Sequence, residues 1–190
     1  MLVTSTCVAC GGGAGPVCAG CAAAVRPAPA VVVEEVDRVW ALMAYDGAAR
    51  ELIRGLKYTN RRSALPALVR SAVALVDEEV DVVTWVPADP GHRRERGYDQ
   101  GQLLARRVAI AVASPARRLL ARQGSRPQTD LDRRRRLVGP TLTARGPVGG
   151  TVLVVDDVVT TGGSLGAAAR ALRAAGAARV LALVLAATPG

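Results

Sequence analysis

The chain has 190 residues, enough for one well-buried domain and a small appendage, and its formal net charge of +9 favours polyanionic partners or phosphorylated ligands. Half of its residues are hydrophobic but none is phenylalanine, so the core must be aliphatic. No apolar run approaches the roughly 20 residues of a membrane helix, and no basic-then-apolar leader starts the chain. We therefore expect a cytoplasmic protein without a membrane span.

The first section, residues 1–26, holds all four cysteines and little apolar sequence. They form two CxxC pairs, Cys7 with Cys10 and Cys18 with Cys21, and seven residues separate the pairs. This spacing suits a tetrahedral zinc site, and four thiolates would leave no open position, so we expect a structural Zn²⁺. In a reducing compartment, metal ligands are favoured over disulfides. Four unrelated thiols or a redox CxxC are the alternatives.

A proline-punctuated linker, residues 27–35, leads into a domain at residues 36–190. In this domain we predict strands at Val36–Tyr45, Asp81–Pro87, Ala116–Arg122, Thr151–Val155 and Arg179–Ala187. We predict helices at Gly47–Tyr58, Ala64–Glu79, Asp99–Ala113 and Ser164–Ala175, the last ended by Gly176. A polar, Arg-rich stretch covers residues 123–150. Continuously apolar strands that alternate with helices indicate an open, mostly parallel α/β sheet with helices on both faces.

The stretch VLVVDDVVTTGGSL begins at Val152 and places two acids after an apolar strand. In open α/β sheets ligands bind beyond the carboxyl ends of the strands. There Asp156 and Asp157 would accept hydrogen bonds from vicinal sugar hydroxyls or hold a hydrated Mg²⁺.

The next helix presents unpaired N–H groups, and small residues let its backbone approach an anion closely. We therefore predict a phosphate cradle at Thr160, Thr161, Gly162, Gly163 and Ser164. The absence of Gly-Lys-Ser/Thr excludes a Walker P-loop. Acids beside a phosphate cradle predict a ribose 5-phosphate site. The alternative is a plain Ser164 N-cap with the acids in a solvated turn.

This stretch resembles the thirteen-residue signature of the type I phosphoribosyltransferases. The resemblance implies a type I phosphoribosyltransferase-like fold that binds phosphoribosyl pyrophosphate (PRPP) with Mg²⁺. It also implies that Asp156 and Asp157 are the catalytic acids that bind the ribose hydroxyls. Thr160 to Ser164 would then bind the 5-phosphate.

A second segment, VPADPGHRRERGYDQ, follows the strand at Asp81–Pro87. Its arginines suit a diphosphate, because guanidinium groups bind phosphate oxygens in a bidentate way. We therefore predict diphosphate binding by Arg93, Arg94 and Arg96. His92, the only histidine, is either a general base or a bystander.

This segment is similar to the ComF family of competence-protein-F-like phosphoribosyltransferases, with Asp99 in place of the usual Asn. That exchange keeps a helix N-cap. The stretches Ala48–Tyr58 and Arg126–Leu137 and the leading four-cysteine motif also resemble this family, whereas the family's later Asn and Phe are not evident in Val138–Ala144.

The densest charge run, Arg133 to Arg136, has three interpretations. It could belong to a loop that closes over diphosphate, because closing loops exclude water from reactive sugar intermediates. It could bind the phosphates of single-stranded DNA. It could also be a solvated face in an Arg-rich composition. The sequence leaves all three open.

Two functions follow from the resemblance. The first is an enzyme, a pentosyl glycosyltransferase that transfers the phosphoribosyl group from Mg²⁺-PRPP to an unidentified acceptor; Trp40–Tyr58 is a weak candidate for base recognition. The alternative is a non-catalytic PRPP-binding or scaffold protein. The family name implies that it would act in DNA uptake during natural competence, through single-stranded DNA or a helicase-like partner. The sequence identifies neither the acceptor nor the oligomeric state.

Overall fold

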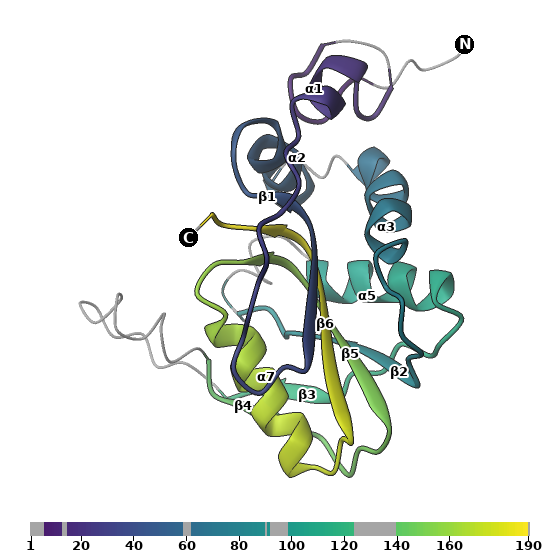
Figure 1. Cartoon of the computed structure of the whole chain (residues 1–190), viewed down its shortest axis with the longest axis vertical. Helices are drawn as coiled ribbons and strands as arrows, with labels where there is room; N and C mark the ends of the chain where they lie inside the picture. Colours follow the sequence, from purple (N-terminus) through teal and green to yellow (C-terminus); the bar gives the residue numbers. More distant parts are fainter. Residues whose placement is uncertain are drawn as a thin grey trace, which may run out of the picture.

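The computed structural model describes residues 6–12, 15–58, 62–89, 91, 99–123 and 140–189. Its centre is a four-stranded sheet in the order β1-β6-β5-β2, in which every neighbouring pair is parallel (Figure 1). The strands are β1 Arg38–Ala44, β2 Val82–Trp85, β5 Thr151–Val159 and β6 Arg179–Ala187. The mostly parallel α/β fold expected from the sequence is confirmed.

Helices cover both faces of this sheet (Figure 1). Inward-facing residues alternate along the strands: Leu153 and Leu181 pack with one set of helices, whereas Val152 and Val180 pack with the other side. The first face carries α2 Gly47–Tyr58, α3 Leu65–Val73 and α5 Gln100–Ala111, and the second carries α7 Gly163–Ala174. Strands buried on both faces explain why the sequence shows continuous apolar runs.

A small second sheet pairs β3 Leu120–Arg122 with β4 Leu142–Ala144 in antiparallel fashion. The strand predicted over Ala116–Arg122 is therefore shorter, and Ala116 forms only an isolated parallel bridge with Val83. β4 lies inside the polar, Arg-rich stretch 123–150, for which we predicted no strand. The remaining elements in the described part of the chain are α1 Ala19–Ala23 and a 3-10 helix at Arg62–Ala64.

The ends of two predicted elements are wrong. β5 runs to Val159 rather than Val155, because its pairing with β6 continues as far as Val159 opposite Ala187. The helix predicted to reach Glu79 ends at Val73. After it the chain turns so that Asp77 and Glu78 form ion pairs with Arg38, and Glu78 also pairs with Arg179, at the amino ends of β1 and β6.

The segment predicted as a linker packs against the sheet domain. We call residues 27–37 the strap. At its start Pro27 bridges Met43 of β1, and the Ala44 N–H donates to the carbonyl oxygen of Arg26 at 2.9 Å. Val33, in its middle, is buried in the same cluster as α7. No helix in the described part of the chain is long and apolar enough to cross a membrane.

Candidate functional site

The two adjacent aspartates lie on the last half of β5, within the strand. Both side chains are partly buried, and the Asp157 N–H donates to Asp156 Oδ1 at 2.8 Å. Asp156 lies opposite Val184 of β6. On the other side, Trp85 at the end of β2 lies opposite Val155, so the carboxyl end of β2 is adjacent to the acids. The sheet therefore places Val86, the first residue of the second segment, beside the acids: its N–H donates to the carbonyl oxygen of Val155 at 3.4 Å.

The loop after β5 turns directly into α7. Thr160 and Thr161 are exposed, and Gly162 is the N-cap of α7 with a left-handed φ of 76°. Glycine adopts this conformation without the steric cost that other residues pay. No side chain caps the helix, and the Gly163 N–H lies 3.5 Å from Thr161 Oγ1. Ser164 lies inside the first turn, so the alternative of a plain Ser164 N-cap is wrong.

The C-terminal end of β6 supports this loop. The Thr188 N–H donates to the carbonyl oxygen of Val159 at 3.0 Å, and Thr188 Oγ1 donates to that of Thr160 at 3.3 Å. These bonds fix the backbone where the strand becomes the loop. A helix N-terminus without a side-chain N-cap and two exposed threonines therefore follow a strand end with a fixed backbone, which is an arrangement suited to an anion.

The N-terminus of α5 lies against the end of β2. Asp99 Oδ1 accepts a hydrogen bond from the Gln102 N–H at 3.2 Å, which confirms the N-cap, and Asp99 Oδ2 accepts from Trp85 Nε1 at 3.3 Å. A Cβ at Gly101 would lie 3.2 Å from the carbonyl oxygen of Val86. The glycine thus allows the close approach of helix and strand.

Several predicted residues lie outside the described part of the chain. They are His92, the proposed diphosphate ligands Arg93, Arg94 and Arg96, and the run Arg133 to Arg136. The described residues on either side of 92–98 are Gly91, which follows β2, and Asp99, the N-cap of α5. The diphosphate assignment therefore stays a prediction.

Two residues near this end of β2 were not singled out in the sequence. Asp89 Oδ1 accepts from the Gly91 N–H at 2.9 Å, and Arg122 of β3 lies 3.8 Å from the same carboxylate. Arg122 also donates to the carbonyl oxygen of Pro87 at 3.4 Å. Among 25 basic residues no local signal distinguishes this arginine. Its position follows from the pairing of β3 with β4.

The buried Gln100 side chain follows the cap of α5. Its Oε1 atom has no hydrogen-bond partner. A buried carbonyl oxygen without a donor is costly, so such an atom beside a polar site is a candidate acceptor for a ligand group or a water.

The four cysteines lie close enough together to hold one metal ion. All of their sulfur atoms are within 4.8 Å of one another, and Cys10 Sγ is 3.9 Å from Cys18 Sγ. Tetrahedral zinc with bonds of about 2.3 Å would separate its sulfurs by about 3.8 Å. The Cys18 N–H also points to Cys7 Sγ at 3.4 Å. The donor set and its spacing fit Zn²⁺.

The environments of the thiols differ. Backbone N–H groups of Cys10 and Cys18 stabilise the thiolate and lower the pKa of Cys7 to about 6. Hydrogen bonds with the Cys18 and Cys10 thiols, together with burial, raise the pKa of Cys21 to about 12. A metal ion bound to all four must therefore displace at least the Cys21 proton at neutral pH.

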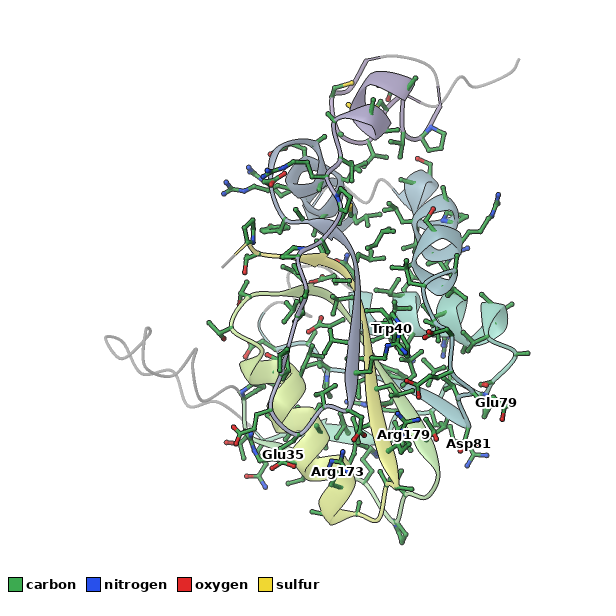
Figure 2. The ribbon with its side chains drawn as sticks, viewed as in Figure 1. Glu35, Trp40, Glu79, Asp81, Arg173 and Arg179 are labelled. Carbon is green, nitrogen blue, oxygen red and sulfur yellow. The ribbon has the colours of Figure 1, made fainter. Side chains whose placement is uncertain are left out.

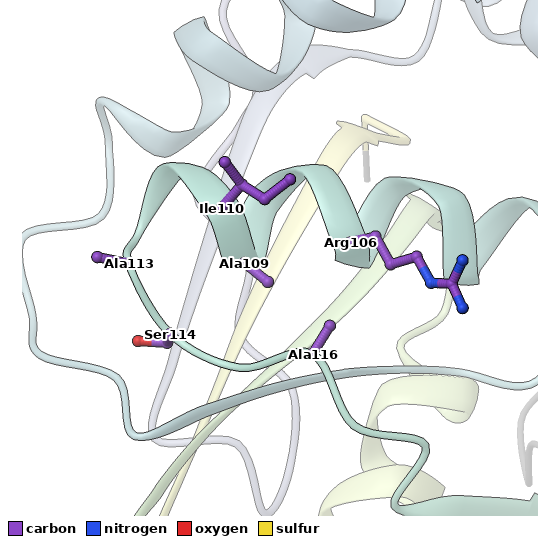
Figure 3. Close-up of a pocket in the computed structure, with 6 residues that line it drawn as sticks. All are labelled: Arg106, Ala109, Ile110, Ala113, Ser114 and Ala116. Carbon is purple, nitrogen blue, oxygen red and sulfur yellow. The ribbon is translucent and has the colours of Figure 1, made fainter.

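Two surface grooves lie away from the acids of β5 and the loop that follows them. One of about 580 Å³ lies between the second half of α5 and residues 114–116, and Figure 3 shows its small side chains with Ile110 and Arg106. Another, of about 470 Å³, is lined by residues that include Glu78 and Asp81 before β2. Both are at the end of α5 remote from Asp99, so neither includes the acids of β5.

One family model matches the part of the chain that contains this site. Residues 99–190 match the family model described as phosphoribosyl transferase domain, just under half of the chain. The match contains both aspartates, the loop and α7. A comparison with curated proteins gave no match.

Three solved structures resemble the chain. The allosteric regulatory enzyme of purine biosynthesis is 25% identical over 65% of this chain and 26% of its own, with a TM-score of 0.46. Glutamine PRPP amidotransferase from B. subtilis, complexed with ADP and GMP, is 28% identical over 64% and 26%, also with a TM-score of 0.46. Adenine phosphoribosyltransferase is 18% identical over 72% and 71%, with a TM-score of 0.37. The chain thus spans about a quarter of the length of the first two.

Proposed function

We propose that this protein binds Mg²⁺-PRPP at the carboxyl ends of β5 and β2 and transfers its phosphoribosyl group to an acceptor. One observation supports the proposal most: an Asp156–Asp157 pair on β5 leads directly into an uncapped helix N-terminus at Gly162, inside a matched phosphoribosyltransferase domain. Carboxylates suit ribose hydroxyls, whereas free N–H groups suit phosphate. PRPP carries both groups a few bonds apart.

The chain's own residues have separate tasks in this proposal. Asp156 and Asp157 accept hydrogen bonds from the ribose hydroxyls and so orient the sugar. The loop from Thr160 to Ser164 holds the 5-phosphate. Arg93, Arg94 and Arg96 stabilise the charge that develops on the diphosphate as the C1–O bond breaks. The bonding electrons leave with diphosphate, and an acceptor lone pair then forms the new bond to C1.

Magnesium fits this set of donors, because hard carboxylate oxygens at a strand end are typical ligands of hydrated Mg²⁺. When bound, the ion would neutralise diphosphate charge and make it a better leaving group.

The first test is a calorimetric titration with PRPP in Mg²⁺. We expect saturable binding by the parent and none by Asp156→Asn/Asp157→Asn. Asp77→Asn, which removes an exposed carboxylate at the opposite end of the sheet, should bind like the parent. If the parent binds, diphosphate release in the presence of different bases would identify the acceptor. If the folded parent does not bind PRPP, the proposal is wrong.

Within this class we propose the ComF type. The support is the four-cysteine cluster before the phosphoribosyltransferase domain and the Asp99–Gln100 start of α5, which follows the family's Arg-Gly-Tyr pattern. The cluster is proposed to hold structural zinc. Metal analysis of protein purified without chelator should give one Zn²⁺ per chain, and a Cys18→Ser variant should lose it.

The second candidate is a PRPP-binding protein that acts with single-stranded DNA or a helicase-like partner in DNA uptake. It is favoured by exposed arginines on and after α5 that form no ion pair with any described residue: Arg106, Arg107, Arg117 and Arg118. Fluorescence anisotropy with a labelled oligonucleotide at several salt concentrations tests it, since phosphate contacts weaken steeply with salt. Absence of binding at low salt would exclude direct DNA contact.

A further inference from the structure

The strap lies far from residues 160–164 in the sequence but packs against them in the fold. We call residues 160–164 the phosphate loop, after the role proposed for them. It descends from the cysteine section along the α7 side of the sheet and then turns into β1 (Figure 1). The two valines in its middle differ sharply: Val32 is 95% exposed, whereas Val33 is 8% exposed. The strap therefore uses a specific side chain to pack on the domain.

Val33 contacts the backbone of the loop itself. A Cβ added to Gly162 would lie only 2.8 Å from Val33 Cγ2. One turn further, a Cβ on Gly166 would lie 3.5 Å from the carbonyl oxygen of Glu34. Because both positions are glycine, the strap packs directly on the turn at which the loop becomes α7.

A tight turn fixes the position of Val33. The Val36 N–H donates to the carbonyl oxygen of Val33 at 3.2 Å, and Glu35 has a left-handed φ of 67°. Arg173, near the other end of α7, donates from Nε to the carbonyl oxygen of Glu35 at 3.1 Å (Figure 2). α7 therefore contacts the strap near its own N-terminus, at Gly162 and Gly166, and near its C-terminus, through Arg173.

Asp37 connects this turn to the sheet. Its carboxylate accepts from the Val180 N–H of β6 and from Arg173, both at 2.7 Å. Burial alone would raise the pKa of Asp37, but the Val180 N–H and the Arg173 guanidinium outweigh it and leave the pKa lowered. The strap is therefore held between helix and sheet immediately after Val33.

We infer that Val33 is a positioning residue for the phosphate loop: through Gly162 it fixes the direction of the N–H groups at the start of α7. The inference rests on the proposed function for its ligand, PRPP. Backbone N–H groups bind an anion tightly only if they are oriented before it binds. Otherwise the entropy lost in ordering them lowers the affinity. The section before the phosphoribosyltransferase match thus completes the site.

The first experiment compares two neighbouring valines. Val33→Ala should weaken binding of Mg²⁺-PRPP by about tenfold, because the loop must then be ordered by the ligand. Val32→Ala is the matched control and should bind like the parent. Equal affinity of all three proteins would overturn the inference.

A double-mutant cycle tests the contact itself. Gly162→Ala alone should weaken PRPP binding more than Val33→Ala, because its Cβ would collide with Val33 and its φ is unfavourable for alanine. In the double variant the collision is removed, so the loss should be clearly smaller than the product of the two single losses. If the two single losses in PRPP affinity simply multiply in the double variant, Val33 does not act through Gly162.

A ligand-free measurement separates this inference from the proposed function. The Gly166 N–H donates to the carbonyl oxygen of Gly162 at 2.8 Å, so its hydrogen exchange reports on the junction. In Val33→Ala exchange there should become at least several-fold faster, while peptides of β6 and all of Val32→Ala stay unchanged. This result would support the positioning role even if the parent bound no PRPP. Unchanged exchange at Gly166, or equally faster exchange in β6, would overturn it.

Discussion

The cysteine section and the sheet domain are stabilised by different physical effects. Among the described residues of 6–26 only Cys7 and Val8 are buried, and α1 buries none. The sheet domain instead packs two largely aliphatic clusters, one on each face of the sheet; one of them includes Trp40 and Trp85, and Val8 joins it. A short segment with so little buried apolar surface needs another source of stability, and four clustered thiols provide a site for it. The sheet domain thus has a core of its own, whereas the cysteine section has a cluster of thiols that fits a metal ion.

Metal removal should have the largest effect: the cysteine section should unfold while the sheet domain stays folded. A structural zinc site contributes about 10–16 kcal/mol to folding of its segment, whereas the sheet domain has its own core. Chelation, or Cys18→Ser, should abolish amide protection in residues 6–24 and leave β5 and β6 protected. Hydrogen exchange measures both regions at once, and Ala9→Ser, which keeps all four thiols, is the control. Loss of protection in β5 would contradict the division.

The converse change removes a core side chain of the sheet. Leu153 is fully buried, and Leu153→Ala should lower the free energy of unfolding by about 3 kcal/mol through lost apolar contact and a cavity. Urea unfolding measures this, with Ile110→Ala, a change at an 82% exposed side chain, as the nearly neutral control. Zinc stoichiometry should stay unchanged in both variants. Loss of zinc in Leu153→Ala would show that the two parts fold as one.

Acid should weaken the metal-dependent part first. The pKa of Cys21 is raised to about 12, so zinc must displace its proton at any neutral pH, and this thiol alone lowers zinc affinity about tenfold per unit fall in pH. The pKa of Cys7, about 6, adds a similar loss only below pH 6. Competition with a chelator of known affinity between pH 8 and pH 5.5 measures the slope. A pH-independent affinity would exclude thiolate ligation.

The smallest expected effect concerns the strap. Asp37→Asn should cost about 1 kcal/mol, because the lost pair with Arg173 is partly exposed and screened. The pKa of Asp37 is lowered on folding, so its contribution is present above the ordinary value of 3.8 and lost as pH falls through the lowered pKa. Urea unfolding between pH 6 and pH 3 should therefore show a shallower acid loss in Asp37→Asn. An unchanged acid slope would exclude this role.

The sequence predicted those elements that depend on residues close together in the chain. The helix Gly47–Tyr58 and the strand Arg179–Ala187 have the bounds read from apolar periodicity, and Asp99 caps α5 as expected. The cysteine spacing likewise anticipated the cluster. In each case the determining residues are close together in the sequence.

What could not be predicted depends on distant partners. Aspartates are poor strand formers, so β5 was expected to stop before Asp156, but pairing with β6 overrides that preference. The three-residue β4 is a strand only because β3 lies beside it. Nothing in a proline-punctuated segment indicates that Val33 will pack on Gly162, since the two are far apart along the chain.

The small β3–β4 sheet has a consequence for how the chain can vary. The Gln123 N–H donates to the carbonyl oxygen of Thr141 at 3.1 Å, so the two ends of the intervening Arg-rich stretch are tied together beside the frame of the site. Once such ends are fixed, doubling the length between them costs only about 0.6 kcal/mol in closure entropy. Insertions or deletions between residues 123 and 141 should therefore cost the fold little, because the pairing of β3 with β4 already fixes where this stretch begins and ends.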